Sequence, residues 1–203
     1  MAAMTPGQRK AIEAFRRTGG VLRTSQALEA GIHPRDLYAL RDAALLAQVS
    51  RGVYRLSELP PLREPDLVTV AARVPKAAVC LISALHFHGQ TPEIPHVVSI
   101  ARLPGTVAPK LAWPPVKVYR FSRPMFEAGI EIHERDGVRL RVYSPAKTIA
   151  DCFKFRNRLG IDVALDALRS GLSERKVKPA EVMHFARICR VDKVMRPFLE
   201  ALA

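Results

Sequence analysis

The feature that most constrains the fold is the short interval between two helical patterns near the N-terminus. Residues 24–30 and 34–44 both show helical apolar spacing, and Gly31, Ile32 and His33 alone separate them. A glycine favours the end of the first helix because it adopts the left-handed conformation of a helix C-terminus, whereas a proline, here at position 34, favours a helix start. So short a connection is typical of a helix-turn-helix.

The elements on either side complete a known arrangement. Thr5-Pro6-Gly7-Gln8 combines a capping box with a proline, and it predicts a helix that Gly19-Gly20 ends. Residues 21–22 are extended, and residues 46–49 and 53–56 read as two strands around a turn at 50–52. This order predicts a winged helix-turn-helix over residues 1–58, in which Tyr54 packs the wing onto the core.

Two helices of this domain have predicted buried faces. We expect Thr24 to cap the second helix, with Ala27 and Leu28 inward. In the third helix, the predicted buried stripe has the i, i+3, i+7 spacing of one helix face. Its members are Leu37, Leu40 and Ala44.

The exposed side of this module predicts binding to double-stranded DNA. Arg35 is expected to contact guanine in the major groove, and Tyr38 and Arg41 a phosphate or a thymine methyl. The start of the second helix is expected to clamp a phosphate, and Arg51, supported by Arg55, to enter the minor groove or touch phosphate. The full set of predicted DNA-binding residues is Thr24, Ser25, Gln26, His33, Arg35, Asp36, Tyr38, Arg41, Arg51 and Arg55.

Several of these residues have simpler interpretations, which stay open here. Arg35 is also compatible with plain solvation, and Asp36 with a partner of the helix dipole. Arg51, beside Gly52, is also compatible with a role in the turn alone.

Net charge supports a polyanionic partner without locating its binding face. The chain has 32 lysines and arginines against 19 acidic residues, a formal charge of +13. Basic surfaces attract nucleic acids and displace their counterions. The excess is spread along the whole chain, so charge alone assigns the partner to neither end.

The paired prolines at 60 and 61 end the first pattern, and we expect a second domain over residues 59–203. We predict helices over 66–74 and 77–88, strands over 97–101 and 116–121, and a hairpin around Asp136-Gly137. The C-terminal end is predicted to be helical, over 144–156, 162–169, 180–189 and 193–202. The fold class is therefore α+β, an N-terminal winged helix-turn-helix followed by an α+β domain.

Other classes of protein and site find little support. No run of about 18 apolar residues predicts a membrane span, and the first residues lack the apolar segment of a secretory signal. The widely spaced Cys80, Cys152 and Cys189 suggest reduced, buried thiols in a cytoplasmic protein, with no metal and no cofactor.

Four blocks of sequence resemble AbiEi-type antitoxins. Residues 24–32 and 45–56 are similar to their N-terminal domain, residues 83–91 to a helix-end motif, and residues 144–153 to the segment that opens their C-terminal helices. Members usually have a glycine after the third helix, where Ala44 stands in this chain.

The resemblance implies a bacterial antitoxin of a type IV toxin–antitoxin system rather than an enzyme. It implies that the winged domain binds repeats in its own promoter and represses the operon. It also implies that the C-terminal domain counters an AbiEii-like nucleotidyltransferase toxin without forming a stable complex.

Two other functions stay open at this point. A nuclease would use Glu174 and Lys176, in an E-x-K triplet, with Asp162 and Asp166 upstream. A basic RNA-binding protein that shields the target of a toxin would use the basic residues of the C-terminal helices.

One pair in the C-terminal half also has an expected role. Lys147 and Asp151 are four residues apart in a predicted helix, and we expect an ordinary surface or half-buried ion pair.

Overall fold

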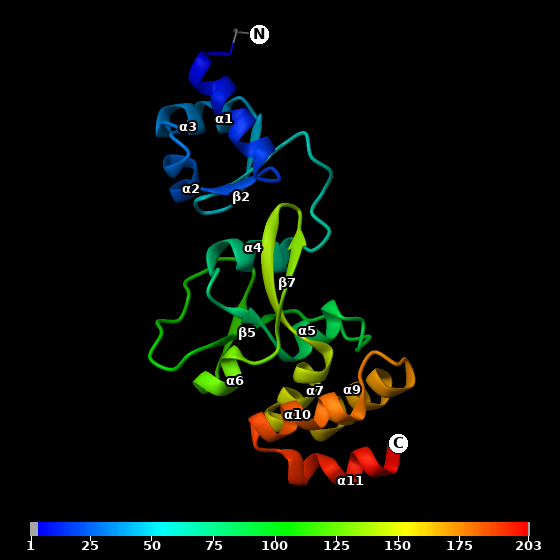
Figure 1. Ribbon diagram of the computed structural model, residues 1–203. Coiled ribbons are helices and arrows are strands. Elements are labelled where there is room, and N and C mark those ends of the chain that lie inside the picture. Colours follow the sequence, from blue (N-terminus) through cyan, green and yellow to red (C-terminus); the bar gives the residue numbers. More distant parts are fainter. Residues whose placement is uncertain (1–3, 203) are drawn as a thin grey trace. The chain divides into compact units, whose positions relative to one another are not determined.

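The computed structural model describes residues 4–202, and the protein belongs to the α+β class (Figure 1). It divides into two compact units, which are described separately. Unit 1 takes in the chain up to Pro75 together with Glu134–Leu140, and unit 2 takes in Lys76–His133 and Arg141 onward.

Unit 1 consists of short helices around a small sheet. Its elements are α1 (Pro6–Arg17), β1 (Val21–Arg23), α2 (Thr24–Glu29), α3 (Pro34–Asp42), β2 (Leu46–Ser50), β3 (Val53–Leu56) and α4 (Pro65–Arg73). The three strands pair antiparallel in the order β1-β3-β2. The sequence predicted this order of elements up to β3, including the turn between β2 and β3.

Local signals start and end these helices as expected. The Thr5 side chain accepts a hydrogen bond from the Gln8 backbone, and the Gln8 side chain accepts one from the Thr5 backbone. The predicted capping box is therefore confirmed. At the start of α3, His33 Nδ1 accepts the Arg35 backbone N–H at 3.1 Å, which satisfies a donor that the helix itself leaves free.

The core of unit 1 lies between α1, α3 and the sheet. Phe15, Leu37 and Leu40 are fully buried, and Tyr54 joins the same cluster from β3. Tyr54 thus packs the β2–β3 hairpin onto the core, as predicted.

The prediction that Ala44 continues the buried stripe of α3 is wrong. The helix ends at Asp42, and Ala44 is exposed with a φ of 56°. The Ala44 and Leu45 backbone N–H groups donate to the Arg41 and Leu40 carbonyls, both at 2.9 Å. These two bonds form a Schellman ending, and it places alanine in the left-handed conformation that glycine usually supplies.

The predictions for α2 are also partly wrong. The helix begins at Thr24 itself, and the residue before it, Arg23, occupies the cap position with its N–H bonded to Gln26 Oε1 at 3.0 Å. Leu28 is 45 % exposed. A helix of six residues turns one position, Ala27, fully toward the core, so the apolar character of Leu28 does not decide its burial.

Unit 2 is built on a mixed sheet with helices. Its strands are β4 (Ala78–Val79), β5 (Val98–Arg102), β6 (Val116–Arg120), β7 (Ile130–Arg135) and β8 (Val138–Tyr143), in the order β6-β5-β4-β8-β7. Its helices are α5 (Leu81–Phe87), α6 (Arg123–Glu127), α7 (Pro145–Lys154), α8 (Arg156–Leu159), α9 (Ile161–Ser173), α10 (Pro179–Cys189) and α11 (Asp192–Leu202). The tip of the β7–β8 hairpin, residues 134–140, groups with unit 1.

Most elements of unit 2 agree with the sequence, and three do not. The hairpin at Asp136-Gly137 is confirmed, with both residues at positive φ. The helix predicted over 77–88 is a strand followed by a helix, because Ala78 and Val79 pair with β5 and β8 in the middle of the sheet. Neither α6 nor α8 was predicted from the sequence.

The Lys147–Asp151 pair lies in the core rather than near the surface, so that prediction is wrong. Both side chains are 0 % exposed, and Lys147 Nζ lies 2.6 Å from each carboxylate oxygen of Asp151. The Cys189 thiol donates to Asp151 at 3.3 Å, and the ammonium lies 4.2 Å from the Tyr143 ring centroid. Burial raises the pKa of Asp151 to about 6, while Lys147 opposes this shift.

Among residues 4–202, no helix has both the length and the apolar character to cross a membrane.

Candidate nucleic-acid interface

Helix α3 presents a free polar face opposite its buried one. Leu37 and Leu40 are fully buried, while Arg35 is exposed and Tyr38 is 42 % exposed. Within the described chain, the Arg35 side chain has no hydrogen bond or ion pair. Its guanidinium is therefore available to an external partner at the first turn of the helix.

The remaining polar residues of α3 bind one another. The Arg41 guanidinium lies 2.7 Å from Asp42 Oδ1 and 5.2 Å from the Tyr38 ring centroid. The hydrogen bond to Asp42 raises the pKa of Arg41. Arg41 is thus held beside Tyr38 by these interactions, whereas the sequence analysis treated it as a free side chain that contacts DNA.

Asp36 faces α1 rather than the free face of α3. A Cβ atom built on Gly7 would lie 2.3 Å from Asp36 Oδ2, so the carboxylate rests against the first turn of α1. This position agrees with the alternative interpretation from the sequence, in which Asp36 interacts with the dipole at the N-terminus of a helix.

The turn between β2 and β3 is fixed from two sides. The Thr24 backbone N–H donates to the Gly52 carbonyl at 2.9 Å, which ties the start of α2 to this turn. Arg73 of α4 donates to the Arg51 carbonyl at 2.7 Å. The Arg51 side chain itself is exposed. Arg73 was missed from the sequence, because nothing local marks an arginine at a helix end as a partner of a turn 22 residues away.

Arg55 does not share this exposure. It is 9 % exposed and donates to the Pro60 carbonyl. Because β3 is the central strand of the sheet, Arg55 is held within the fold and is not free to support Arg51 at a DNA surface.

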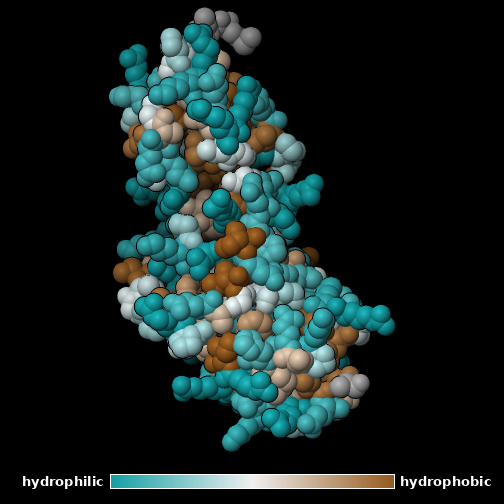
Figure 2. Space-filling model, in the orientation of Figure 1, coloured by the Kyte–Doolittle hydropathy of each residue, from teal (hydrophilic) through white to brown (hydrophobic). Residues whose placement is uncertain are grey.

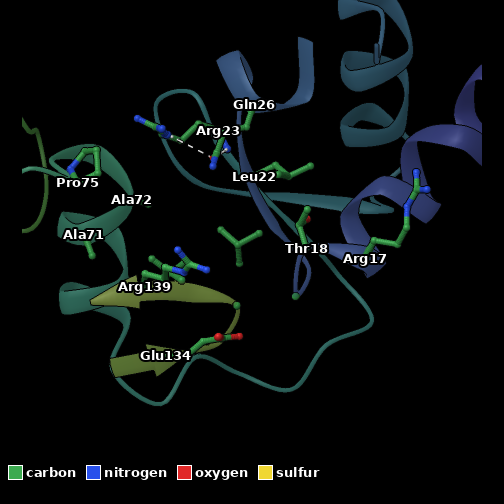
Figure 3. Close-up of a pocket in the computed structure, with 14 residues that line it drawn as sticks. Arg17, Thr18, Leu22, Arg23, Gln26, Ala71, Ala72, Pro75, Glu134 and Arg139 are labelled. Carbon is green, nitrogen blue, oxygen red and sulfur yellow. Dashed lines mark hydrogen bonds between the residues drawn. The ribbon is translucent and has the colours of Figure 1, made fainter. Parts of the chain in front are cut away.

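A cavity of about 550 Å³ in unit 1 adds further basic groups (Figure 3). It is lined by β1 and α2, by α4, and by the hairpin tip, including Arg23, Arg139 and one carboxylate, Glu134. Arg23 Nε donates to Gln26 Oε1 at 3.3 Å. Gln26 therefore serves the start of α2, and both it and Ser25 are exposed.

The predicted residues thus fall into three sets. Arg35 and Tyr38 are exposed on α3, Arg41 on the same helix is half-buried, and His33 is exposed at the cap position before it. Thr24 and the turn of Arg51 are joined by hydrogen bonds. Asp36 and Arg55 are directed into the fold.

Figure 2 shows that hydrophilic residues cover most of the visible surface, with hydrophobic ones scattered among them.

No group of three or more His, Cys, Asp or Glu side chains that could hold a metal ion occurs in the described part of the chain. Glu174, considered above as a nuclease residue, accepts from Ser170 at 2.5 Å and pairs with Lys176 at 2.6 Å. These bonds fix it at the end of α9.

No curated protein matches the chain. The crystal structure of the RV2827C protein from Mycobacterium tuberculosis is similar at 15 % identity and a TM-score of 0.46, covering 100 % of this chain and 84 % of that one. A likeness at this level supports no inference about fold or function.

The family match is confined to unit 1. Residues 9–57 match the sequence model described as "Transcriptional regulator, AbiEi antitoxin", as the resemblance in the sequence predicted. The matched segment includes α2, α3 and the β2–β3 hairpin, the elements that carry the exposed residues described above. Over residues 9–57 this protein is therefore similar to the AbiEi antitoxin family of transcriptional regulators.

Proposed function

We propose that residues 1–58 form a winged helix-turn-helix that binds double-stranded DNA, with α3 as the recognition helix. The observation that carries the proposal is the free face of α3, where Arg35 and Tyr38 are exposed opposite Leu37 and Leu40. The family match to transcriptional regulators over the same residues supports it.

The roles of the α3 residues follow from the chemistry of the major groove. Recognition helices present their N-terminal residues to base edges, and arginine donates two parallel hydrogen bonds to guanine O6 and N7. Arg35 sits in the first turn of α3 without an internal partner, so it reads the base. Tyr38 lies one turn further on and contacts a phosphate or a thymine methyl, with Arg41 held beside it.

The β2–β3 hairpin acts as the wing. Its tip carries Arg51, whose backbone is held by Arg73 and whose side chain stays exposed. A fixed turn presents its arginine at lower entropic cost than a mobile one. Arg51 contacts phosphate or the minor groove, and Thr24 and Ser25 approach the DNA backbone next to it.

The finer biological role also belongs to this proposal. The protein represses its own operon by binding repeats in the promoter, and residues 59–203 counter a nucleotidyltransferase-like toxin without a stable complex. The description of the family that residues 9–57 match, an antitoxin that is also a transcriptional regulator, supports the general role of a DNA-binding antitoxin.

The experiment that tests DNA recognition uses the full chain and fluorescence anisotropy on DNA from upstream of its own gene. Arg35→Ala should weaken binding to the best site by about 1–3 kcal/mol and relax preference at one base pair. Arg123→Ala is the matched control, because this arginine is 72 % exposed on α6 in unit 2.

An equal loss of affinity for all DNA sequences would show that Arg35 contacts phosphate only. Tighter binding to RNA of the same sequence would favour the RNA-shielding alternative. A promoter–reporter fusion tests autoregulation separately, since Arg35→Ala should raise reporter output, whereas protection from a co-expressed toxin tests residues 59–203.

A further inference from the structure

Arg73 of α4 lies at the proposed wing, although it is outside the segment that matches the family. Its Nη1 atom donates to the Arg51 carbonyl at 2.7 Å, and a Cβ atom built on Gly52 would lie 3.8 Å from the same nitrogen. Thr24, at the start of α2, also reaches this turn, since its backbone N–H donates to the Gly52 carbonyl at 2.9 Å. The Arg73 guanidinium is therefore beside the point where the wing and the start of α2 meet.

The bond to the turn leaves most of this guanidinium free. An arginine has five N–H donors, and one of them binds the Arg51 carbonyl. Arg73 is exposed, and its other donors have no hydrogen-bond partner among the described residues. Phosphate groups accept such donors in parallel pairs, so Arg73 is held in place and still able to bind an external phosphate.

A second basic group reaches this part of unit 1 from the tip of the β7–β8 hairpin. Arg139 is exposed and lines the cavity of Figure 3 together with Arg23 and Gln26, and the figure shows it between α4 and β1. Its side chain has no hydrogen bond or ion pair within the described chain, although Glu134 lines the same cavity. Because Arg23 and Gln26 flank the first residues of α2, Arg139 lies next to the start of that helix.

Packing fixes both the hairpin tip and α4 on the small sheet of unit 1. Val21 of β1 and Ala72 of α4 belong to one buried apolar cluster, and Val138 of the hairpin packs against it. The backbones also touch, since a Cβ atom built on Gly19 would overlap the backbone of Gly137. The arginines on α4 and on the hairpin are therefore carried by fixed backbone, which lowers the entropic cost of binding through them.

The segments around this surface contain little negative charge. Residues 17–28, 46–57 and 67–75 include no aspartate or glutamate, and Glu134 is the one carboxylate in the cavity lining. Arginines with few acids nearby attract DNA phosphates and displace the counterions that surround them.

We propose that Arg73 and Arg139 bind phosphates of the DNA backbone beside the wing, and that they extend the DNA interface beyond residues 9–57. This inference rests on the DNA-binding function proposed for unit 1. Neither arginine lies on α3, so both contribute affinity and orientation rather than base recognition.

The test is fluorescence anisotropy of the full chain on DNA from upstream of its own gene, over a range of salt concentrations. Arg73→Ala and Arg139→Ala should each lower the slope of log K against log salt by about 1, and weaken binding roughly five- to tenfold at 0.1 M salt. The loss should be the same on the best site and on an unrelated duplex, since phosphates carry no sequence. Arg123→Ala, at the exposed position of α6, is the control and should change neither value.

A lysine variant separates phosphate binding from support of the turn. Arg73→Lys keeps the positive charge, so it should keep the salt slope of the wild type and most of its affinity. If Arg73 served the turn alone, its alanine and lysine variants would lose affinity equally at an unchanged slope, and the proposal would be wrong.

The other outcomes distinguish this inference from the function on which it rests. An unchanged slope in Arg73→Ala or Arg139→Ala, while Arg35→Ala still weakens binding, would overturn the inference and leave the proposed function standing. Failure of the wild type to bind DNA would refute the proposed function, and this inference with it.

Discussion

The buried pair of Lys147 and Asp151 gives the sharpest test of the energetics of unit 2. Lys147→Met removes the ammonium but keeps most of the length and volume of the side chain. It leaves the Asp151 carboxylate 0 % exposed, with the Cys189 thiol as its remaining hydrogen-bond donor among the described residues. Removing one partner of a buried pair costs about 3–5 kcal/mol, far more than the roughly 0–1 kcal/mol of an exposed pair.

A double variant separates the charge imbalance from the loss of the pair itself. Lys147→Met/Asp151→Leu removes both charges, so it should recover most of the stability lost in the single variant. The assay is urea unfolding of the full chain at pH 7, followed by far-ultraviolet circular dichroism. The coupling energy from the cycle should be at least about 2 kcal/mol, because the two groups are in direct contact.

The reasoning would be refuted by a loss under about 1 kcal/mol in Lys147→Met, the value of a solvated surface pair. It would also be refuted if the double variant were as unstable as the sum of the two single variants, because the pair would then contribute no coupling.

The remaining predictions concern pH, the end of α3 and the wing. Burial raises the folded pKa of Asp151 to about 6, above its ordinary value of 3.8, so the folded state binds the proton more tightly than the unfolded state. The stability that this group contributes is therefore present at low pH and is lost as the pH rises through 6. In the same unfolding assay, the free energy of unfolding of the wild type should rise relative to that of the double variant between pH 7 and 5. Ala44→Gly should stabilise unit 1 by about 0.5–1 kcal/mol in thermal unfolding, because glycine adopts the left-handed conformation of this position without strain. Ala43→Gly, at a φ of −82°, is the control and should destabilise unit 1. A loss of stability in Ala44→Gly would contradict the observed helix end. Arg51→Ala should weaken DNA binding to all sequences alike and lower the slope of log K against log salt by about 1 in anisotropy titrations; unchanged affinity would remove the wing from the interface.

Local hydrogen bonds explain which parts of the fold were predictable. The start of α1 at Thr5, the start of α3 at His33 and the turn at Asp136-Gly137 depend on partners within about four residues, or on backbone conformations that particular residues favour. Their signals are therefore complete within a short stretch of sequence. The exposed face of α3, with Arg35 and Tyr38, follows from the same local periodicity.

The errors in the candidate site have a different origin. Arg55 carries the same charge as Arg51, but it lies on the central strand of its sheet and bonds to the Pro60 carbonyl. Arg73 donates to the Arg51 carbonyl in the β2–β3 turn from a helix outside the family match. A periodic sequence pattern predicts neither the burial of Arg55 nor the bond from Arg73, because each depends on which chain segments pack together.

The sequence by itself determined the order of elements in unit 1, the helix and hairpin signals, the α+β class and the similarity of residues 9–57 to the AbiEi antitoxin family. Tertiary structure alone decided that Lys147 and Asp151 are enclosed, that Ala78-Val79 is a strand, that Ala44 lies beyond the end of α3, and that Gln90 is buried. The physical reason is that burial and strand pairing are set by residues far away in the chain, whereas caps and turns are set by immediate neighbours.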